Sequence, residues 1–393
     1  MTVDDPSEEE QHADGIVEIQ EYRAPPPPTA KEFAPWHKPR KQYVREYQWS
    51  REILDLVNRW PRGNSTLKYL GLPGVDLLDL RYFHKAICET KNLGLRFLGF
   101  NASAQPRSPA NSEMNLALDE VRRLRGVDPL SNVLGDGFER MANCNSMAWH
   151  AARDLGPYDV VNLDFCDGFG SHAPGDLHKS NYDAVAALLA IQARTIEPWL
   201  LFLTTRVDKP NVRDDVLEIL VEKYRSNLGE YGEFRSASQD CFGIDSEEAL
   251  RDAKDSASGL LSVFLTGLCK WFVAQGLTHQ PPVSVEVCSA FGYRVQEGVA
   301  EQDLVSLALR FRPTLNPVGD PLGLASGPST GPDEGSLATR AISRVANRTD
   351  ADNSLVGDQT LRHRMTVATS ELLGVARYDV NEYFRWVEEA RSE

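Results

Sequence analysis

The segment that most constrains this chain is residues 158–170, with the sequence YDVVNLDFCDGFG. Residues 159–163 form a short, mostly apolar run rich in β-branched side chains, which is typical of a strand covered on both faces of a sheet. Asp164 follows this strand directly, and Phe165 and Asp167 come next. In an open α/β sheet, ligands bind in the crevice outside the carboxyl ends of the strands. We therefore expect a site at this strand end, with the alternative that Asp164 caps the following helix and Asp167 holds a turn.

Composition narrows the classes of protein to which this chain can belong. A length of 393 residues suits one large domain with additions, or two domains. The formal net charge of −15 argues against nonspecific coating of DNA, although it is compatible with a local basic patch. The 6 cysteines lack CxxC pairs and zinc-type spacing, which predicts reduced thiols in a cytoplasmic protein and no metal site. The sequence shows no signal peptide and no run of about 18 apolar residues, so we expect no membrane span.

The N-terminal region combines a polar tail with a basic, aromatic arm. Residues 1–34 are acidic and then proline-rich, a composition typical of disordered tails. In residues 35–64, cations alternate with tryptophan and tyrosine before a predicted helix. The cations of this arm are candidates for contacts with nucleic-acid phosphates or with a partner: Lys38, Arg40, Lys41 and Arg45. The alternative is that the aromatic side chains fix the arm to the domain while the cations pair with acids or face solvent.

Strands and helices alternate through the middle of the chain. We predict strands at these ranges: 75–80, 93–101, 131–137, 159–163, 199–206, 283–288 and 304–311. The first five alternate with helices, which favours parallel pairing, and the last two form a C-terminal antiparallel hairpin. The predicted fold class is α/β, a seven-stranded mostly parallel sheet with helices on both faces. We further expect a helical insertion at 210–280, a linker at 313–350 and a helical extension at 351–393.

Over residues 65–312, the chain resembles the class I S-adenosylmethionine-dependent methyltransferases, as a divergent member of that fold. The resemblance rests on the order of the predicted strands and on the polar residues at their ends. In that family the cofactor lies across the ends of the first strands, which implies cofactor-binding roles for four residues: Asp79, Asn101, Asp136 and Phe165. Asp79 would lie near the methionine end, Asn101 at the ribose hydroxyls and Asp136 near the adenine.

The first predicted strand departs from the pattern of these enzymes. Their glycine-rich loop follows the first strand, whereas Gly71 and Gly74 precede the predicted strand at 75–80. Asp79 is followed instead by a Leu-Arg-Tyr-Phe segment, whose bulky side chains would crowd the close approach of a cofactor to the backbone. With this placement of the strand, the chain lacks the glycine loop.

Three functions remain open from the sequence. The resemblance implies an S-adenosylmethionine-dependent methyltransferase, in which Asp164 or Asp167 orients or deprotonates an acceptor of open identity, nucleic acid being one class. The alternative is a catalytically degenerate methyltransferase-like subunit that binds a protein partner through the N-terminal tail or the C-terminal helices. Such a subunit would serve a larger complex, as in bacterial antiviral defence systems that act on nucleic acid. The third alternative is a metal-dependent hydrolase that uses Asp164, Asp167 and His172.

Overall fold

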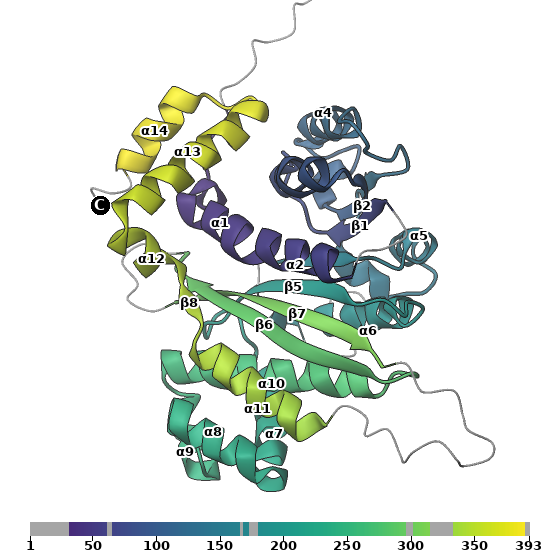
Figure 1. Cartoon of the computed structure of the whole chain (residues 1–393). Coiled ribbons are helices and arrows are strands. Elements are labelled where there is room, and N and C mark those ends of the chain that lie inside the picture. Colours follow the sequence, from purple (N-terminus) through teal and green to yellow (C-terminus); the bar gives the residue numbers. More distant parts are fainter. Residues whose placement is uncertain are drawn as a thin grey trace, which may run out of the picture. The chain divides into compact units, whose positions relative to one another are not determined.

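The sheet is built from strands whose side chains alternate between two hydrophobic layers. The computed structural model describes residues 31–60, 65–165, 168–172, 180–295, 302–314 and 333–389. Within these ranges the strands are β1 Thr66–Gly71, β2 Gly94–Phe100, β3 Asn132–Leu134, β4 Val160–Asp164, β5 Trp199–Arg206, β6 Val283–Tyr293, β7 Leu304–Pro313 and β8 Thr349–Asp350. They form a sheet in the order β3-β2-β1-β4-β5-β7-β6-β8 (Figure 1).

The directions of the strands confirm the predicted fold class. β1 pairs in parallel with β2 and β4, β2 pairs in parallel with β3, and β4 with β5. β7 runs antiparallel to both of its neighbours, β5 and β6, so β6 points in the same direction as β5. The predicted C-terminal hairpin is therefore present, with its second strand inserted beside β5. β8 adds a short parallel pairing to β6, within the region predicted as a linker.

The prediction of the first strand was wrong. Residues 75–80 are not a strand, because helix α3, Leu78–Phe83, begins within this range and β1 ends earlier, at Gly71. Three apolar side chains here recur with helical spacing and are fully buried: Leu77, Leu80 and Phe83. Because these buried side chains recur every three residues rather than every two, the segment forms a helix instead of a strand. Gly71 and Gly74 consequently lie at the end of the first strand and after it, not before it.

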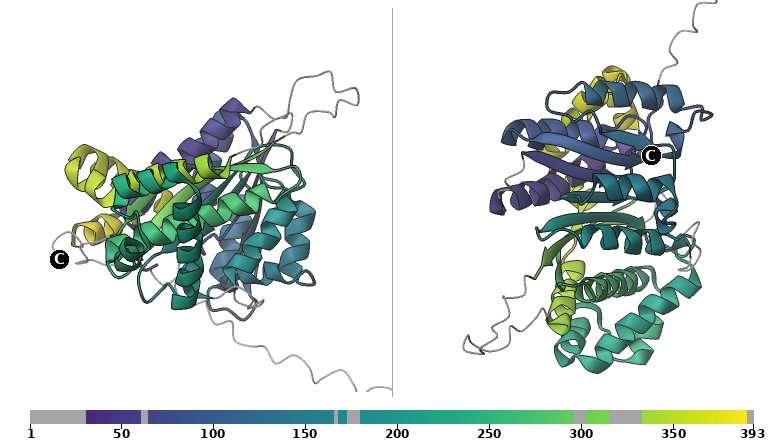
Figure 2. Two further views of the ribbon diagram at one scale, coloured as in Figure 1. Left: turned by 90° about the horizontal axis from the view of Figure 1, so that it is seen from below. Right: turned by 90° about the vertical axis from the view of Figure 1, so that its right-hand side faces the viewer.

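Helices cover both faces of the sheet (Figure 2). In β4, Val160 belongs to one hydrophobic layer whereas Val161 and Leu163 belong to the other, as expected for side chains that alternate along a strand. The layer of Val160 is covered by α1 Pro39–Val44, α2 Arg51–Arg59, α3, α4 Asn111–Arg122, α12 Ala351–Gly357 and α13 Gln359–Val375. The other layer is covered by α5 Met147–Leu155, α6 Asn181–Gln192, α7 Asp214–Glu230, α8 Gly232–Phe242, α9 Glu247–Ala253, α10 Ala257–Leu277 and α11 Glu334–Ala346.

The helical stretch predicted at 210–280 contains α7, α8, α9 and α10. By length and composition alone, α10 is long and apolar enough to cross a membrane. The expectation that the chain has no apolar run of about 18 residues was therefore wrong. This run is 72% buried within the structure, as in the central helix of a folded core. Phe264 and Phe272 of α10 pack into the same hydrophobic layer as Leu201 and Leu203 of β5.

The N-terminal arm and the C-terminal helices pack together beside the sheet. α1 continues through a short π-helical segment into α2, and it contacts α12 and α13 (Figure 1). The ring centroid of Phe33 lies 5.4 Å from that of Trp386 in α14, Val380–Glu389. The hydroxyl of Tyr383 donates a hydrogen bond to the His37 carbonyl at 2.8 Å. The arm and the C-terminal helices thus belong to the same compact unit as the sheet, which extends from Phe33 onward.

Candidate functional site

The carboxyl ends of the parallel strands bring most of the predicted site residues to one edge of the sheet. Four of them lie at or directly after the ends of β2, β3 and β4: Asn101, Asp136, Asp164 and Phe165. Because these strands are parallel, their ends meet at the same edge, which is where ligands bind in open α/β sheets. Asp79 is placed differently, because it lies in α3 rather than at a strand end. Asp167 lies outside the described residues.

Asp164 is held by a lysine from the N-terminal helix. Lys41 Nζ lies 2.6 Å from Asp164 Oδ2, and the two side chains are 6% and 22% exposed. Burial alone would lower the pKa of Lys41, but the nearby Asp164 carboxylate leads the charges that outweigh it and raise the pKa above its ordinary value. The ammonium also lies 4.6 Å from the ring centroid of Trp49, a distance that favours a cation–π interaction. Lys41 therefore stays charged and fixes the Asp164 carboxylate at the strand end.

The next turn of the same helix repeats this arrangement. Arg45 Nε donates to Asp79 Oδ1 at 2.6 Å, and both side chains are buried. Arg45 Nη1 is buried with no hydrogen-bond partner among the described residues. The Asp79 carboxylate therefore stabilises the contact between the arm and α3, whereas the sequence predicted a role for it at the methionine end of a cofactor.

The two remaining cations of the arm also contact the domain. Arg40 Nε lies 3.3 Å from Asp352 Oδ1, and Lys38 Nζ lies 5.9 Å from the ring centroid of Trp386. With the buried Lys41, these contacts direct the cations of the arm toward the domain. This agrees with the alternative in which the aromatic side chains fix the arm to the domain and the cations pair with acids. In this conformation Lys41 and Arg45 do not lie on a surface that a phosphate could reach.

Tyr69 in β1 and Tyr293 at the end of β6 are buried near these two ion pairs. A Cβ added at Gly71 would lie 2.6 Å from Tyr69 Oη, so a glycine is needed where this ring folds over the strand end. Burial first, and then the Asp79 charge, raise the pKa of Tyr69 well above its ordinary value, and burial raises the pKa of Tyr293 to about 12. Both hydroxyls therefore stay protonated at neutral pH. We call the following residues the polar cluster: Lys41, Arg45, Tyr69, Asp79, Asp164 and Tyr293.

The loops that follow β1, β2 and β3 pack directly against one another. Asn101 Nδ2 donates to the Pro73 carbonyl at 2.8 Å, and Asn101 Oδ1 accepts from the Ser103 amide at 2.7 Å. A Cβ added at Gly135 would lie 2.7 Å from the Gln105 amide nitrogen, so the third loop fits closely against the second. Asn101 thus ties the loops together, and these hydrogen bonds occupy the amide that the sequence assigned to the ribose.

Gly74 and Asp136 are the more open positions at this edge. Gly74 is exposed, and a Cβ added there would have no described atom within 4 Å. Its φ also lies outside the left-handed region, so neither packing nor backbone conformation explains a glycine at this position. Asp136 is 31% exposed and accepts a hydrogen bond from the Gly137 amide at 3.0 Å. Phe165 is half-buried, with its ring centroid 6.0 Å from that of Phe138.

Sequence reasoning did not place Lys41, Tyr69 or Tyr293 at the strand ends. A signal existed for Lys41, because it and Arg45 are four residues apart, the spacing that puts two side chains on one helix face. Tyr69 and Gly71 are two residues apart in a strand, which places them on the same face of the sheet. Tyr293 carries no comparable local signal.

The described residues provide no support for the metal-dependent alternative. Within the ranges given above, no group of three or more His, Cys, Asp and Glu side chains is arranged to hold a metal ion. His172 Nδ1 lies 3.1 Å from Ser171 Oγ, a contact between neighbours in the chain. The third proposed ligand, Asp167, is outside the described residues.

Comparison with known proteins places the arm and the sheet within one family unit. A search of curated proteins finds none that matches this chain. A protein-family model matches residues 30–388, a range that includes the arm, all strands of the sheet and nearly all of α14. The matched range therefore extends beyond the predicted α/β domain at residues 65–312 on both sides. The chain belongs to the PP_RS20740-like family.

Proposed function

We propose that this chain is an S-adenosylmethionine-dependent methyltransferase. The observation that carries the proposal is the segment Gly71-Leu72-Pro73-Gly74, which comes at the end of β1. A glycine allows a ligand to approach the backbone closely, which is its role after the first strand of nucleotide-binding α/β folds. The lack of glycines after the predicted first strand was the main departure of the sequence from the methyltransferase pattern. With β1 ending at Gly71, Gly74 follows the first strand and has open space beside it, whereas Tyr69 fills the space beside Gly71; the open position of Gly74 supports the proposal.

The arrangement of the sheet supports the proposal. From β1 the chain adds β2 and β3 on one side, and then β4 and β5 on the other, so the strand order reverses between β1 and β4. Open α/β sheets bind their ligands at this reversal. Gly71 and Asp164 end the two strands that flank it. An antiparallel β7 between β5 and β6 is also in keeping with the resemblance to class I methyltransferases.

Some of the residues that the resemblance assigned to the cofactor fit this role better than others. The open backbone at Gly74 suits the methionine end of the cofactor, and the carboxylate of Asp136 suits the adenine amine. The half-buried ring of Phe165 suits a flat ring face. Asn101 fits less well because its amide is engaged, and Asp79 fits less well because it pairs with Arg45. Bound S-adenosylmethionine supplies the methyl group on a sulfonium, which is already an activated donor.

Asp164 is the residue we assign to the methyl acceptor. One of its oxygens is held by Lys41, and the side chain keeps 22% exposure, so the carboxylate is both fixed and reachable. A fixed carboxylate can orient an acceptor through a hydrogen bond and accept its proton. Lys41 acts through Asp164, as a positioning residue that holds this carboxylate in place.

Gly74→Val tests the assignment of the loop. We expect the variant to bind S-adenosylmethionine at least about tenfold more weakly than the natural protein, which is about 1.4 kcal/mol of binding free energy. Its unfolding free energy should change by less than about 0.5 kcal/mol, because an added side chain meets open space. Isothermal titration calorimetry with S-adenosylmethionine and S-adenosylhomocysteine, together with urea denaturation, measures the two quantities.

Gly357→Val is the matched control, since Gly357 also has no described atom near an added Cβ and lies at the end of α12. This control should bind the cofactor normally, whereas Asp136→Ala should weaken binding as Gly74→Val does. Equal affinity of Gly74→Val and the natural protein would exclude the loop as the cofactor site. A folded natural protein that produces no binding heat with either ligand would exclude the methyltransferase proposal.

One observation favours a second candidate, a methyltransferase-like subunit that binds a partner without catalysis. Asp79 and Asp164 already form ion pairs within the fold, which is what a structural role requires. If cofactor binding is absent, a comparison of proteins that co-purify with the full chain and with a chain lacking residues 1–30 tests this candidate. The truncation should not extend to residue 50, because Trp49 is fully buried in the domain.

A further inference from the structure

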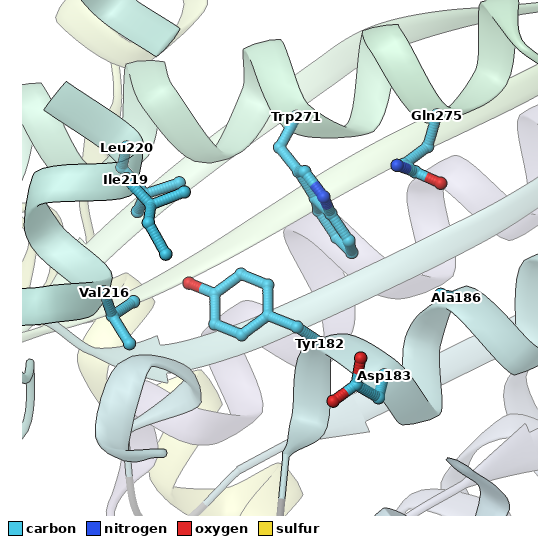
Figure 3. Close-up of a pocket in the computed structure, with 8 residues that line it drawn as sticks. All are labelled: Tyr182, Asp183, Ala186, Val216, Ile219, Leu220, Trp271 and Gln275. Carbon is cyan, nitrogen blue, oxygen red and sulfur yellow. The ribbon is translucent and has the colours of Figure 1, made fainter. Parts of the chain in front are cut away.

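A cavity lies between helices α6, α7 and α10, in the hydrophobic layer opposite the N-terminal arm (Figure 3). Its volume is about 190 Å³, and its lining is mainly apolar. Val216, Ile219 and Leu220 of α7 form one side, and Trp271 of α10 extends toward Tyr182 of α6. A cavity of about 150 Å³ is large enough for benzene, so this one has room for a six-membered ring with a small substituent. It opens to solvent beside the exposed side chains of Ala186 and Ile219.

The hydroxyl of Tyr182 is a buried polar group at the wall of this mainly apolar cavity. The side chain is 6% exposed, and its Oη has no hydrogen-bond partner among the described residues. In Figure 3 the hydroxyl points away from α6, toward Val216 and Ile219. A buried hydroxyl without a partner is unfavourable, so an acceptor atom that reaches it gains a hydrogen bond at little cost of desolvation. Burial also raises the pKa of Tyr182 far above its ordinary value, so the hydroxyl stays a donor.

The remaining lining residues restrict the ligand further. The ring centroid of Trp271 lies 5.3 Å from that of Tyr182, with the two planes at 78°, so the cavity has aromatic side chains at an angle to each other. Aromatic rings pack favourably against such walls. Asp183 and Gln275 also line the cavity. Its mainly apolar walls would remove the hydration of an ionised ligand, which disfavours an anion.

We propose that this cavity binds a small, uncharged aromatic compound that carries a hydrogen-bond acceptor, and that the Tyr182 hydroxyl donates to that acceptor. The cavity is distinct from the site at the strand ends, although a series of rings connects them. The centroid of Phe169 lies 5.6 Å from that of Phe165, which follows β4, and 4.3 Å from that of Tyr182. The proposal does not depend on whether the chain binds S-adenosylmethionine.

A matched pair of tyrosine variants tests the state of the hydroxyl in the free protein. Tyr182→Phe removes only an oxygen without a described partner, so the urea midpoint should stay the same or rise. Tyr158→Phe is the control, because the Tyr158 hydroxyl donates to the Ala152 carbonyl at 3.0 Å and its loss should lower the midpoint. A lower midpoint for Tyr182→Phe than for Tyr158→Phe would show that the Tyr182 hydroxyl is already satisfied, which would overturn the proposal.

The binding experiment compares three probes of similar size on the full chain, using ligand-observed NMR. Benzamide carries an uncharged acceptor, toluene has none, and benzoate is an anion. We expect benzamide to bind most tightly, and Tyr182→Phe to weaken benzamide by about fivefold while leaving toluene unchanged. Ala186→Leu, at an exposed position of the lining, should weaken both. Equal binding of benzamide to the natural protein and Tyr182→Phe, or no binding of benzamide at millimolar concentration, would overturn the proposal.

Discussion

Replacement of Lys41 with methionine is expected to lower the free energy of unfolding by about 3 kcal/mol. Methionine keeps the length and apolar stem of lysine, so the main loss is the charge that compensates Asp164. Removal of one partner of a buried ion pair leaves the other charge without compensation, and this costs about 3–5 kcal/mol. The lower end of that range applies because the Asp164 side chain is 22% exposed and regains some hydration. Urea denaturation of the natural protein and the variant measures the difference.

Two further variants separate the ion pair from other effects of the substitution. The double variant Lys41→Met with Asp164→Leu removes both charges and should recover most of the lost stability. Arg59→Met breaks the exposed pair of Arg59 with Asp55 and should cost less than about 0.5 kcal/mol. A loss below about 1 kcal/mol for Lys41→Met would contradict the assignment of a stabilising buried pair.

The same ion pair has a defined dependence on pH. Because the pKa of Lys41 is raised in the folded protein, its stabilisation is fully present below the ordinary pKa of lysine. The contribution is lost only as the pH rises toward the raised value of the folded state. The difference in stability between the natural protein and Lys41→Met should therefore remain large at neutral pH and decrease at strongly alkaline pH.

The strands that the sequence predicts well are those with a strong local pattern. The expected range 199–206 is the range of β5, because a continuous apolar run covered on both faces has few other stable conformations. β1 was missed because Lys68 and Gly71 weaken its pattern, while the more apolar run that follows has a spacing that also suits a helix. β8 has only two residues and exists through its pairing with β6, which no local pattern reveals.

Only the site residues that lie at the ends of strands could be predicted from the sequence. Asp136 and Asp164 follow from the rule that polar residues at the carboxyl ends of parallel strands share one edge. The partner of Asp164 did not follow from that rule, because Lys41 is 123 residues away in the sequence and reaches the edge through the packing of the arm. A run of cations and aromatic residues is equally compatible with a nucleic-acid surface and with an arm that packs into the domain, and no local pattern in the sequence distinguishes the two.

Replacement of Trp49 with alanine is expected to lower the free energy of unfolding by about 3–5 kcal/mol. The Trp49 side chain is 0% exposed, and its ring centroid lies 6.2 Å from those of Phe83 and Phe202, so truncation leaves a large cavity between the arm and the sheet. Its Nε1 donates to Ser306 Oγ at 3.1 Å, and this hydrogen bond is lost as well. Lys41 also loses the aromatic ring beside its ammonium. Urea denaturation gives the total effect.

The matched control is Trp36→Ala in the same arm. Trp36 is 56% exposed, so its truncation removes little buried surface and should change stability by less than about 1 kcal/mol. Limited proteolysis shows whether the loss is local, since Trp49→Ala should make residues 35–60 more sensitive to cleavage while Trp36→Ala should not. If the arm were an independent surface for nucleic acid, both variants would have small and similar effects on stability. A large effect confined to Trp49 would instead mean that the arm is part of the folded core and holds Lys41 at the end of β4.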